Sequence, residues 1–288
     1  MGSRKVVLLL GTLLLALAWR EADGRARAPL ATNEMAVEIY DGYITLAQGS
    51  ANGVPNLRFL LDTGATDSAI DRTVAEKLGL RIRPTHVTSF DKTVVSGWAL
   101  TDLTFGPEHA SNARVMIEDL SYLQRLGIHI DGVIGLDWLR RRSFAVNYAR
   151  QCITFGPVET AGMRGVPMLA NETAIRVEAK VDGRPVWMAA DTGAPTPVLY
   201  EESLDDLAVS YRLESRMDWL SVGGHVESHM AMVPRFQVGG QDLSREVVLV
   251  SVPRAKRVIE VSGYFGIASL GAKEVVFDFD RNQLFWKK

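Results

Sequence analysis

The chain contains three short segments twice, in the same order and at nearly the same spacing. The tetrapeptide DTGA occurs at residues 62–65 and again at 191–194, which is 129 residues later. Two further pairs are each 131 residues apart: GVIGLDWL at 132–139 with GYFGIASL at 263–270, and NYARQCITF at 147–155 with DFDRNQLFW at 278–286. A chance repeat of one tripeptide would not bring the other two matches with it. The sequence therefore predicts two similar halves, each a copy of one fold.

Both halves are predicted to consist mostly of β-strands. Alternating apolar and polar residues broken by turn residues, typical of hairpins, occur in EIYDGYITLA at 38–47 and in AIRVEAKVDGRPVWMAA at 174–190. Each half ends in a further predicted hairpin, with turns at Ala149-Arg150 and Asp280-Arg281. Short helices are expected at 71–78 and 201–208. The Gly- and Pro-rich stretch at 156–170 shows no clear period and is interpreted as the linker between the halves.

Composition excludes several classes of partner. The 288 residues carry a formal net charge of −2, which does not favour binding to nucleic acid or to an anionic membrane. Cys152 is the single cysteine, so no intramolecular disulfide is possible. We interpret it as a small buried apolar residue, because no motif for a nucleophile surrounds it.

The N-terminus has the order of a secretory signal peptide. Arg4 and Lys5 precede the apolar run VVLLLGTLLLALAW at 6–19, and small and polar residues follow. The run is shorter than the roughly 20 residues that a spanning helix needs. Cleavage after Ala18 or after Ala28 would fit. We therefore expect residues 1–28 to be a signal peptide and the mature protein to be exported, either periplasmic or secreted; an uncleaved anchor is less favoured and no stable membrane insertion is expected.

The repeated DTG triplets follow apolar runs, which places a carboxylate at the end of a buried strand. Such a group is costly to bury unless it is hydrogen-bonded. The glycine permits a tight turn whose N–H groups approach the carboxylate, and the threonine hydroxyl can bond within or across the turns. If the halves are related by a pseudo-twofold axis, Asp62 and Asp191 meet on it. Two close carboxylates share one proton, so the pair supplies both an acid and a base for activating water.

These paired motifs resemble the retropepsin-like aspartic proteases, in particular the bacterial type with two fused copies in one chain. The resemblance covers residues 36–288. It implies an all-β, two-lobed acid-protease fold, each lobe being a small closed β-barrel with one or two short helices. The implied domains are an N-terminal lobe at 29–156, a linker at 157–170 and a C-terminal lobe at 171–288.

The resemblance also implies a role for particular residues. Asp62 and Asp191 would be catalytic, and the dyad would be held by Thr63, Gly64, Thr192 and Gly193. A segment of two apolar residues and a glycine would pack beside each catalytic turn: Val133-Ile134-Gly135 in the first half, and Tyr264-Phe265-Gly266 in the second. Flap hairpins that close over substrate would have their tips at Asp91-Lys92 and Gly223-Gly224, of which only the second has the expected glycines.

Other candidates are set aside on their local context. His225 and His229 are four residues apart, but they lie in a predicted hairpin, where strand geometry separates them too far to share a metal ion. Asp131 and Asp137 flank the first apolar-Gly segment and are interpreted as surface or turn-capping residues, because Asp191 already stands at the position equivalent to Asp62. No metal or other cofactor is expected.

The sequence thus predicts an aspartic endopeptidase that acts on extended peptides or proteins, built as a monomer with an intramolecular pseudo-dimer of lobes. Three alternatives stay open. The chain could be a catalytically silent peptide-binding module of the same fold, the lobes could pair between chains, or the protein could be a dedicated processing enzyme with one partner.

Overall fold

The computed structural model describes residues 30–89, 92–221, 224–252, 257 and 259–288. The predicted signal peptide lies outside these residues. None of the helices in the described part of the chain is long and apolar enough to cross a bilayer.

The first lobe is a closed barrel. Its strands, in ring order, are β2 (Ile44–Ala51), β3 (Val54–Leu61), β8 (Gly132–Ile134), β4 (Ala69–Asp71), β7 (Glu108–Glu118) and β6 (Lys92–Phe105), which pairs back with β2. The β3–β8 and β4–β7 pairs are parallel and the other pairs are antiparallel. A further strand, β5 (Arg83–Ser89), forms a long hairpin with β6.

The second lobe repeats this arrangement. Its ring contains β12 (Ile175–Val181), β13 (Arg184–Asp191), β20 (Gly263–Gly266), β14 (Val198–Tyr200), β19 (Glu246–Val250) and β16 (Gly224–Met232). The chain then continues into β17 (Phe236–Val238), which pairs back with β12 and with the short β18 (Gln241–Asp242). Again two pairs are parallel, β13–β20 and β14–β19, and β15 (Arg212–Ser221) forms a long hairpin with β16. The fold is all-β and two-lobed, as the sequence predicts.

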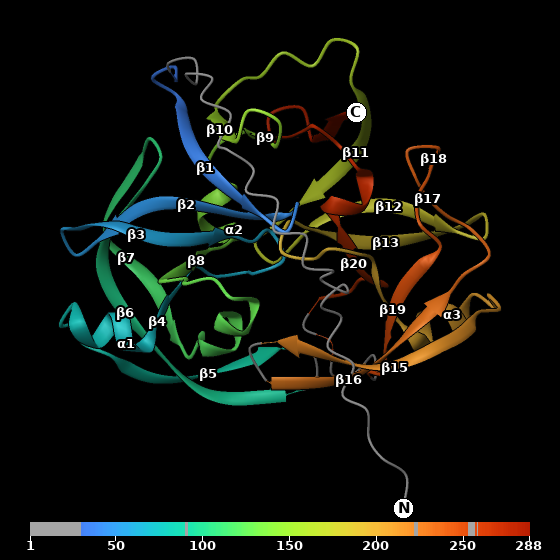
Figure 1. Cartoon of the computed structure of the whole chain (residues 1–288), viewed down its shortest axis with the longest axis horizontal. Helices are drawn as coiled ribbons and strands as arrows, with labels where there is room; N and C mark the ends of the chain where they lie inside the picture. Colours follow the sequence, from blue (N-terminus) through green and yellow to red (C-terminus); the bar gives the residue numbers. More distant parts are fainter. Residues whose placement is uncertain (1–29, 90–91, 222–223, 253–256, 258) are drawn as a thin grey trace, which may run out of the picture.

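A six-stranded antiparallel sheet joins the lobes (Figure 1). Its order is β1 (Glu34–Tyr40), β10 (Cys152–Phe155), β9 (Phe144–Asn147), β21 (Glu274–Asp278), β22 (Gln283–Lys287) and β11 (Arg164–Ala170). The predicted closing hairpins are therefore its four central strands, and β9 pairs with β21 across the lobe boundary. The stacked rings of Phe144 and Phe277, with centroids 4.8 Å apart, fill this junction.

Part of the predicted linker is a strand. Residues 157–163 belong to no helix or strand, but residues 164–170 form β11, which pairs with both β22 and β12. The apolar side chains of Val166 and Met168 point to the core at alternate positions, so the segment is a strand despite its glycine and proline.

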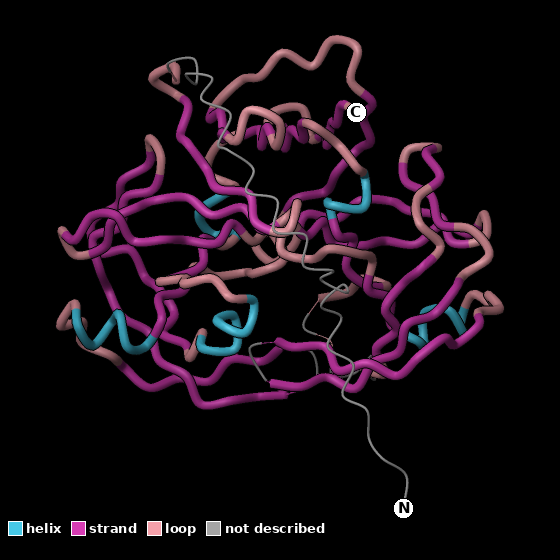
Figure 2. The backbone as a smooth tube through the Cα atoms, viewed as in Figure 1, coloured by secondary structure: helices cyan, strands magenta, loops and turns pink. Residues whose placement is uncertain are grey.

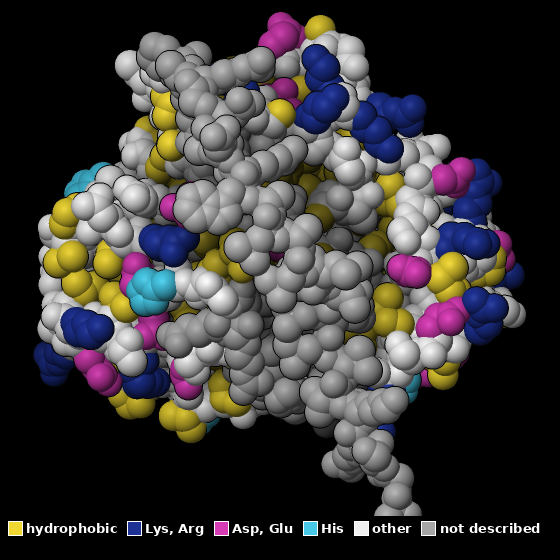
Figure 3. Space-filling view, in the orientation of Figure 1, with side chains coloured by type: hydrophobic (Ala, Val, Ile, Leu, Met, Phe, Trp, Pro, Cys, Tyr) yellow, Lys and Arg dark blue, Asp and Glu magenta, His cyan; other side chains and the backbone are white. Residues whose placement is uncertain are grey.

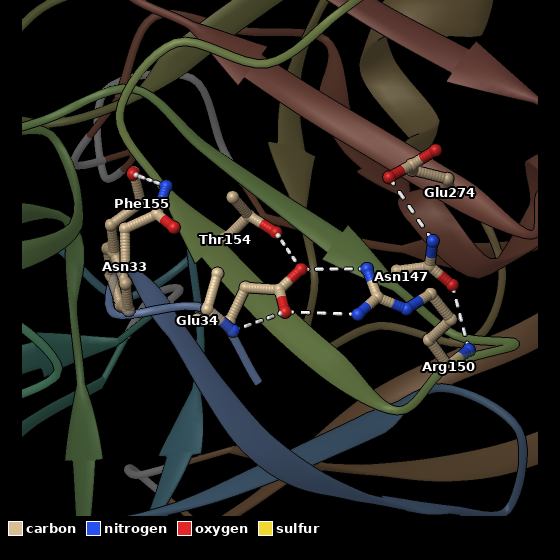
Figure 4. A network of polar contacts seen from close by, with 8 residues as sticks. Asn33, Glu34, Asn147, Arg150, Thr154, Phe155 and Glu274 are labelled. Atoms are coloured by element: carbon tan, nitrogen blue, oxygen red, sulfur yellow. Dashed lines mark hydrogen bonds and ion pairs between the residues drawn. The ribbon is translucent and has the colours of Figure 1, made fainter. Parts of the chain in front are cut away.

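Polar contacts extend along the sheet that joins the lobes (Figure 4). The carboxylate of Glu34 accepts two hydrogen bonds from the guanidinium of Arg150, at 2.7 and 3.0 Å. Asn147 on β9 donates its amide to Glu274 on β21 at 3.2 Å and accepts from the N–H of Arg150 at 2.8 Å. This network therefore crosses from one lobe to the other.

Each barrel has an inner and an outer apolar face, because side chains alternate along a strand. The inner faces form one continuous core that includes Phe59, Leu61 and Ile134. The outer face of the first lobe carries a separate cluster, here called the first-lobe face cluster: Ile44, Leu46, Leu60, Ala69, Met116, Leu120, Ile128, Ile130 and Val133. The second-lobe face cluster includes Ala189, Val198, Tyr200, Val248 and Val250.

Short helices and the two long hairpins complete the lobes. The helices α1 (Arg72–Lys77), α2 (Leu136–Leu139) and α3 (Glu201–Asp206) follow β4, β8 and β14, and α1 begins where the Asp71 carboxylate accepts the N–H of Thr73. A 3-10 helix, η1 (Ser121–Leu126), follows β7 and another, η3 (Ile267–Leu270), follows β20. In Figure 2 the β5–β6 and β15–β16 hairpins extend toward the midline, opposite the six-stranded sheet. Acidic and basic side chains are interspersed over the visible surface of both lobes (Figure 3).

Candidate active site

The two DTG turns have the same setting in their lobes. Asp62 follows β3, and its N–H donates to the carbonyl of Ile134 on the parallel strand β8 at 3.1 Å. Asp191 is the last residue of β13 and pairs with Gly266 on the parallel strand β20. Each aspartate therefore lies where two parallel strands end side by side, and the apolar run before it is a buried strand.

Crossed hydrogen bonds tie the two turns together. The N–H of Thr63 donates to the hydroxyl of Thr192 at 3.0 Å, and the N–H of Thr192 donates to the hydroxyl of Thr63 at 3.1 Å. Each hydroxyl also donates to a carbonyl of the opposite lobe, Thr63 to Ala190 at 2.8 Å and Thr192 to Leu61 at 2.9 Å. Both threonines are buried, so these four bonds fix the separation of the turns.

The glycines of the turns are in contact with the opposite carboxyl groups. A β-carbon on Gly64 would come within 2.6 Å of the carboxyl carbon of Asp191, and one on Gly193 would come within 3.0 Å of that of Asp62. Only glycine lets the turns approach this closely, so both sequence-predicted glycines have a steric role.

Backbone donors point at the two carboxylates. One oxygen of Asp62 accepts the N–H of Gly64 at 2.8 Å and that of Ala65 at 3.2 Å. One oxygen of Asp191 accepts the N–H of Gly193 at 2.7 Å. The two side chains also form a hydrogen bond with each other. A hydrogen bond between two carboxyl groups requires a proton on one of them.

Burial raises the pKa of both aspartates, and the charge of Asp62 raises that of Asp191 further. For Asp62 burial is the main cause, and the N–H bonds from Gly64 and Ala65 partly oppose it. The pKa of Asp191 is held well above its ordinary value by burial first and then by the charge of Asp62. The pair therefore keeps one shared proton over a wide pH range, with Asp191 as its favoured carrier.

The apolar-Gly segments lie beside the turns. Ile134 and Phe265 are fully buried in the core. A β-carbon on Gly135 would come within 2.6 Å of the backbone of Asp67, and one on Gly266 would come within 2.6 Å of the carbonyl of Ala194. The chain crosses itself closely at both places.

The predicted flap tips are only partly described. Asp91 and Gly223 lie outside the described residues. Lys92 and Gly224 are the first residues of β6 and β16, where they pair with Ser89 and Ser221. The two hairpins therefore exist where the sequence places them. The side chain of His225 is also outside the described part, so the absence of a metal site at His225 and His229 stays a prediction.

Two aspartates set aside in the sequence accept hydrogen bonds within the first lobe. Asp137 accepts both the N–H and the hydroxyl of Ser68, at 2.8 and 2.7 Å, and Asp131 accepts the N–H of Arg58 at 2.8 Å. Asp131 is buried rather than on the surface. Asp137 thus holds the turn that precedes β4, and Asp131 holds the segment before β8 against β3.

Of three tyrosines near the dyad, Tyr43 and Tyr122 were not identified from the sequence. Charges of the dyad contribute to the raised pKa of Tyr43, Tyr122 and Tyr264, although burial is the larger cause in each. Tyr264 stands in the second apolar-Gly segment, which the resemblance placed beside the turn, where the first half has Val133. Tyr43 and Tyr122 carry no such signal, since their approach depends on how the barrel closes.

The geometry agrees with the comparison with known proteins. A family model described as "Aspartyl protease" matches the chain twice, over residues 47–138 and 177–266. Each match contains one DTG turn and one apolar-Gly segment. No curated protein matches the chain.

Proposed function

This chain belongs to the aspartyl protease family, and we propose that it is an endopeptidase whose Asp62 and Asp191 activate water between the two lobes. The observation that carries the proposal is the set of crossed Thr63–Thr192 hydrogen bonds, which brings one carboxyl group from each lobe into contact. Thr63, Gly64, Thr192 and Gly193 are the residues that position this pair.

The reaction follows from the shared proton. Ionised Asp62 takes a proton from water as the water oxygen attacks the scissile carbonyl carbon, while protonated Asp191 donates to the carbonyl oxygen. This step yields a tetrahedral diol and exchanges the protonation of the two carboxyl groups. Asp191 then takes a proton from a diol hydroxyl, Asp62 protonates the departing nitrogen, and the carbon–nitrogen bond breaks. The dyad ends in its starting protonation state.

An extended peptide is the proposed substrate. The two long hairpins, β5–β6 and β15–β16, reach toward the midline from opposite lobes and would act as the flaps. One chain supplies both aspartates, so a monomer suffices. The apolar segment at 6–19 supports export of the mature protein after removal of residues 1–28.

Cleavage of a diverse peptide library by the mature protein tests the proposal. Asp62→Asn and Asp191→Asn should each lower kcat/KM by about a thousandfold or more, because an amide can neither accept nor release a proton and the remaining carboxyl cannot act as both acid and base. Asp182→Asn is the matched control, since Asp182 lies exposed in the turn between β12 and β13.

Either dyad variant with full activity would overturn the proposed mechanism. A wild-type protein that binds peptides but cleaves none of them would instead indicate the silent binding module.

A further inference from the structure

Glu118, the last residue of β7, is a buried carboxyl group without a partner among the residues that the structure describes. It is 9% exposed. Its side chain forms no hydrogen bond or ion pair with any of those residues. Burial of an unpaired carboxylate is unfavourable, and such groups in folded proteins call for a specific explanation.

The side chain of Glu118 lies on the same face of the barrel as the catalytic dyad. Residues two apart on a strand share a face, so Glu118 points to the side of Met116, which belongs to the first-lobe face cluster. Asp62 bears the same relation to Leu60, another member of that cluster. The charges of both Asp62 and Glu118 contribute to the raised pKa of Tyr122, after burial as the larger cause.

The second lobe lacks this acidic feature. Glu118 pairs with Asp71 on β4, and the equivalent pair in the second lobe is Val250 with Tyr200. The equivalent of Asp67, five residues after the catalytic aspartate, is Thr196. The two sides of the dyad therefore differ by three carboxylates, those of Asp67, Asp71 and Glu118, although the barrels repeat one another.

We propose that Glu118, with Asp67 near it, forms a subsite that accepts a lysine or arginine side chain of the peptide substrate on the first-lobe side of the dyad. This inference rests on the proposed function, because it assumes that a peptide binds there. A cation would supply the missing partner of a nearly buried carboxylate, and charge-assisted hydrogen bonds of this kind are strong. A substrate with one basic side chain would then bind in a single orientation.

The other charged groups of this region are either acidic or already in contact with another side chain or backbone group. Asp67 raises the pKa of Glu118, after burial as the larger cause, to about 7. Asp71 accepts the N–H groups of Thr73 and Leu120, and Asp137 accepts from Ser68. Arg83 and Arg114 lie over the ring of Trp98, at 4.6 and 5.3 Å from its centroid, and the charge of Arg72 contributes to the lowered pKa of Asp119.

Peptide binding to the cleavage-silent Asp62→Asn protein tests the subsite. The probes are fluorescein-labelled peptides that differ at one position, where Lys, Met or Glu is placed in turn along an otherwise constant sequence. The Lys peptide should bind about tenfold more tightly than the Met peptide at one position on one side of the scissile bond, measured at about pH 8 where Glu118 is ionised. This ratio should fall as the pH is lowered through about 7.

Two substitutions of Glu118 distinguish the effect of its charge from the effect of its size. Glu118→Gln keeps the size of the side chain and should bring the Lys-to-Met ratio close to one at every pH. Glu118→Val copies the second lobe and should do the same. Asp182→Asn should keep the wild-type ratio, because Asp182 lies in an exposed turn of the other lobe. Thermal unfolding of each variant confirms that it folds.

The outcomes distinguish this inference from the proposed function. An unchanged ratio in Glu118→Gln, or no position that prefers Lys, overturns the subsite even if the wild-type protein cleaves the Met peptide. A Lys preference that depends on Glu118 supports the subsite even if the wild-type protein cleaves neither peptide, a result that would refute only the endopeptidase activity.

Discussion

Gly64 of the first lobe lies against the carboxyl group of Asp191 in the second lobe. A β-carbon at Gly64 would be 2.6 Å from the carboxyl carbon and 2.7 Å from one of its oxygens. The reciprocal contact, of Gly193 with Asp62, is looser at 3.0 Å. The position of each carboxyl group thus depends on the absence of a side chain in the other lobe.

Gly64→Ala should consequently damage the dyad more than Gly193→Ala does. The added methyl group must displace Asp191, and small displacements of a reacting group lower the rate of the chemical step steeply, here by about a hundredfold in kcat/KM. Because a β-carbon at Gly193 would lie farther from Asp62, Gly193→Ala should lower kcat/KM by a smaller factor. Steady-state kinetics on one cleaved peptide measure both, and equal rates for Gly64→Ala and the wild type would contradict the steric argument.

Thr63→Val should destabilise the fold, whereas Thr63→Ser should be tolerated. Valine has no hydroxyl, so the buried N–H of Thr192 and the carbonyl of Ala190 both lose their partner. Each unsatisfied group costs about 1–3 kcal/mol of unfolding free energy. Serine keeps both bonds and is the matched control. Urea unfolding of the three proteins decides the matter, and a valine variant as stable as the serine variant would show that the crossed bonds are dispensable.

Glu118→Gln should make stability less dependent on pH. Because the pKa of Glu118 rises from 4.5 to about 7 on folding, the folded state favours the protonated carboxyl. The associated stabilisation is complete below pH 4.5 and disappears as pH rises through about 7, a change of about 3 kcal/mol. Urea unfolding at about pH 4 and about pH 8 measures it, because glutamine does not titrate. Equal pH dependence in both proteins would mean that Glu118 is not buried as described.

Phe144→Ala should weaken the junction of the lobes. The rings of Phe144 and Phe277 stack at 4.8 Å, are both fully buried, and come from opposite lobes. Loss of a buried phenylalanine side chain costs about 3–5 kcal/mol of unfolding free energy. Val95→Ala is the control, since Val95 is 75% exposed. A loss below about 1 kcal/mol would show that the lobes are held together mainly elsewhere.

Much of the fold follows from the repeated segments. The three matched segments locate the DTG turns, the strands that end beside them and the closing hairpins, because these features are local and occur twice. The threonine hydroxyls were predicted to bond within or across the turns, and the structure shows bonds across them.

The strand β11 could not be predicted from its own residues. Gly165 and Pro167 read as turn residues, and only Val166 and Met168 point inward. The segment is a strand because its backbone pairs with β22, which lies more than a hundred residues later in the chain. Proline is tolerated there, since β11 is the outermost strand of the sheet at that point.

The burial of Glu118 could not be predicted from the sequence either. The residues around it, IEDL at 117–120, read as the polar end of a strand. Its environment is created by β4, by the turn after Asp62 and by η1, which are brought together only when the barrel closes. Sequence patterns report which face a residue takes, but not what covers it.

The six-stranded sheet that joins the lobes also determines how the dyad responds to dilution. β9 and β21 are neighbours in one folded chain, so each DTG turn meets its partner at an effective concentration set by the chain itself and not by the amount of protein present. A site assembled from two separate chains would fall apart as the solution is diluted. The proposed activity per molecule should therefore be the same in a dilute solution as in a concentrated one.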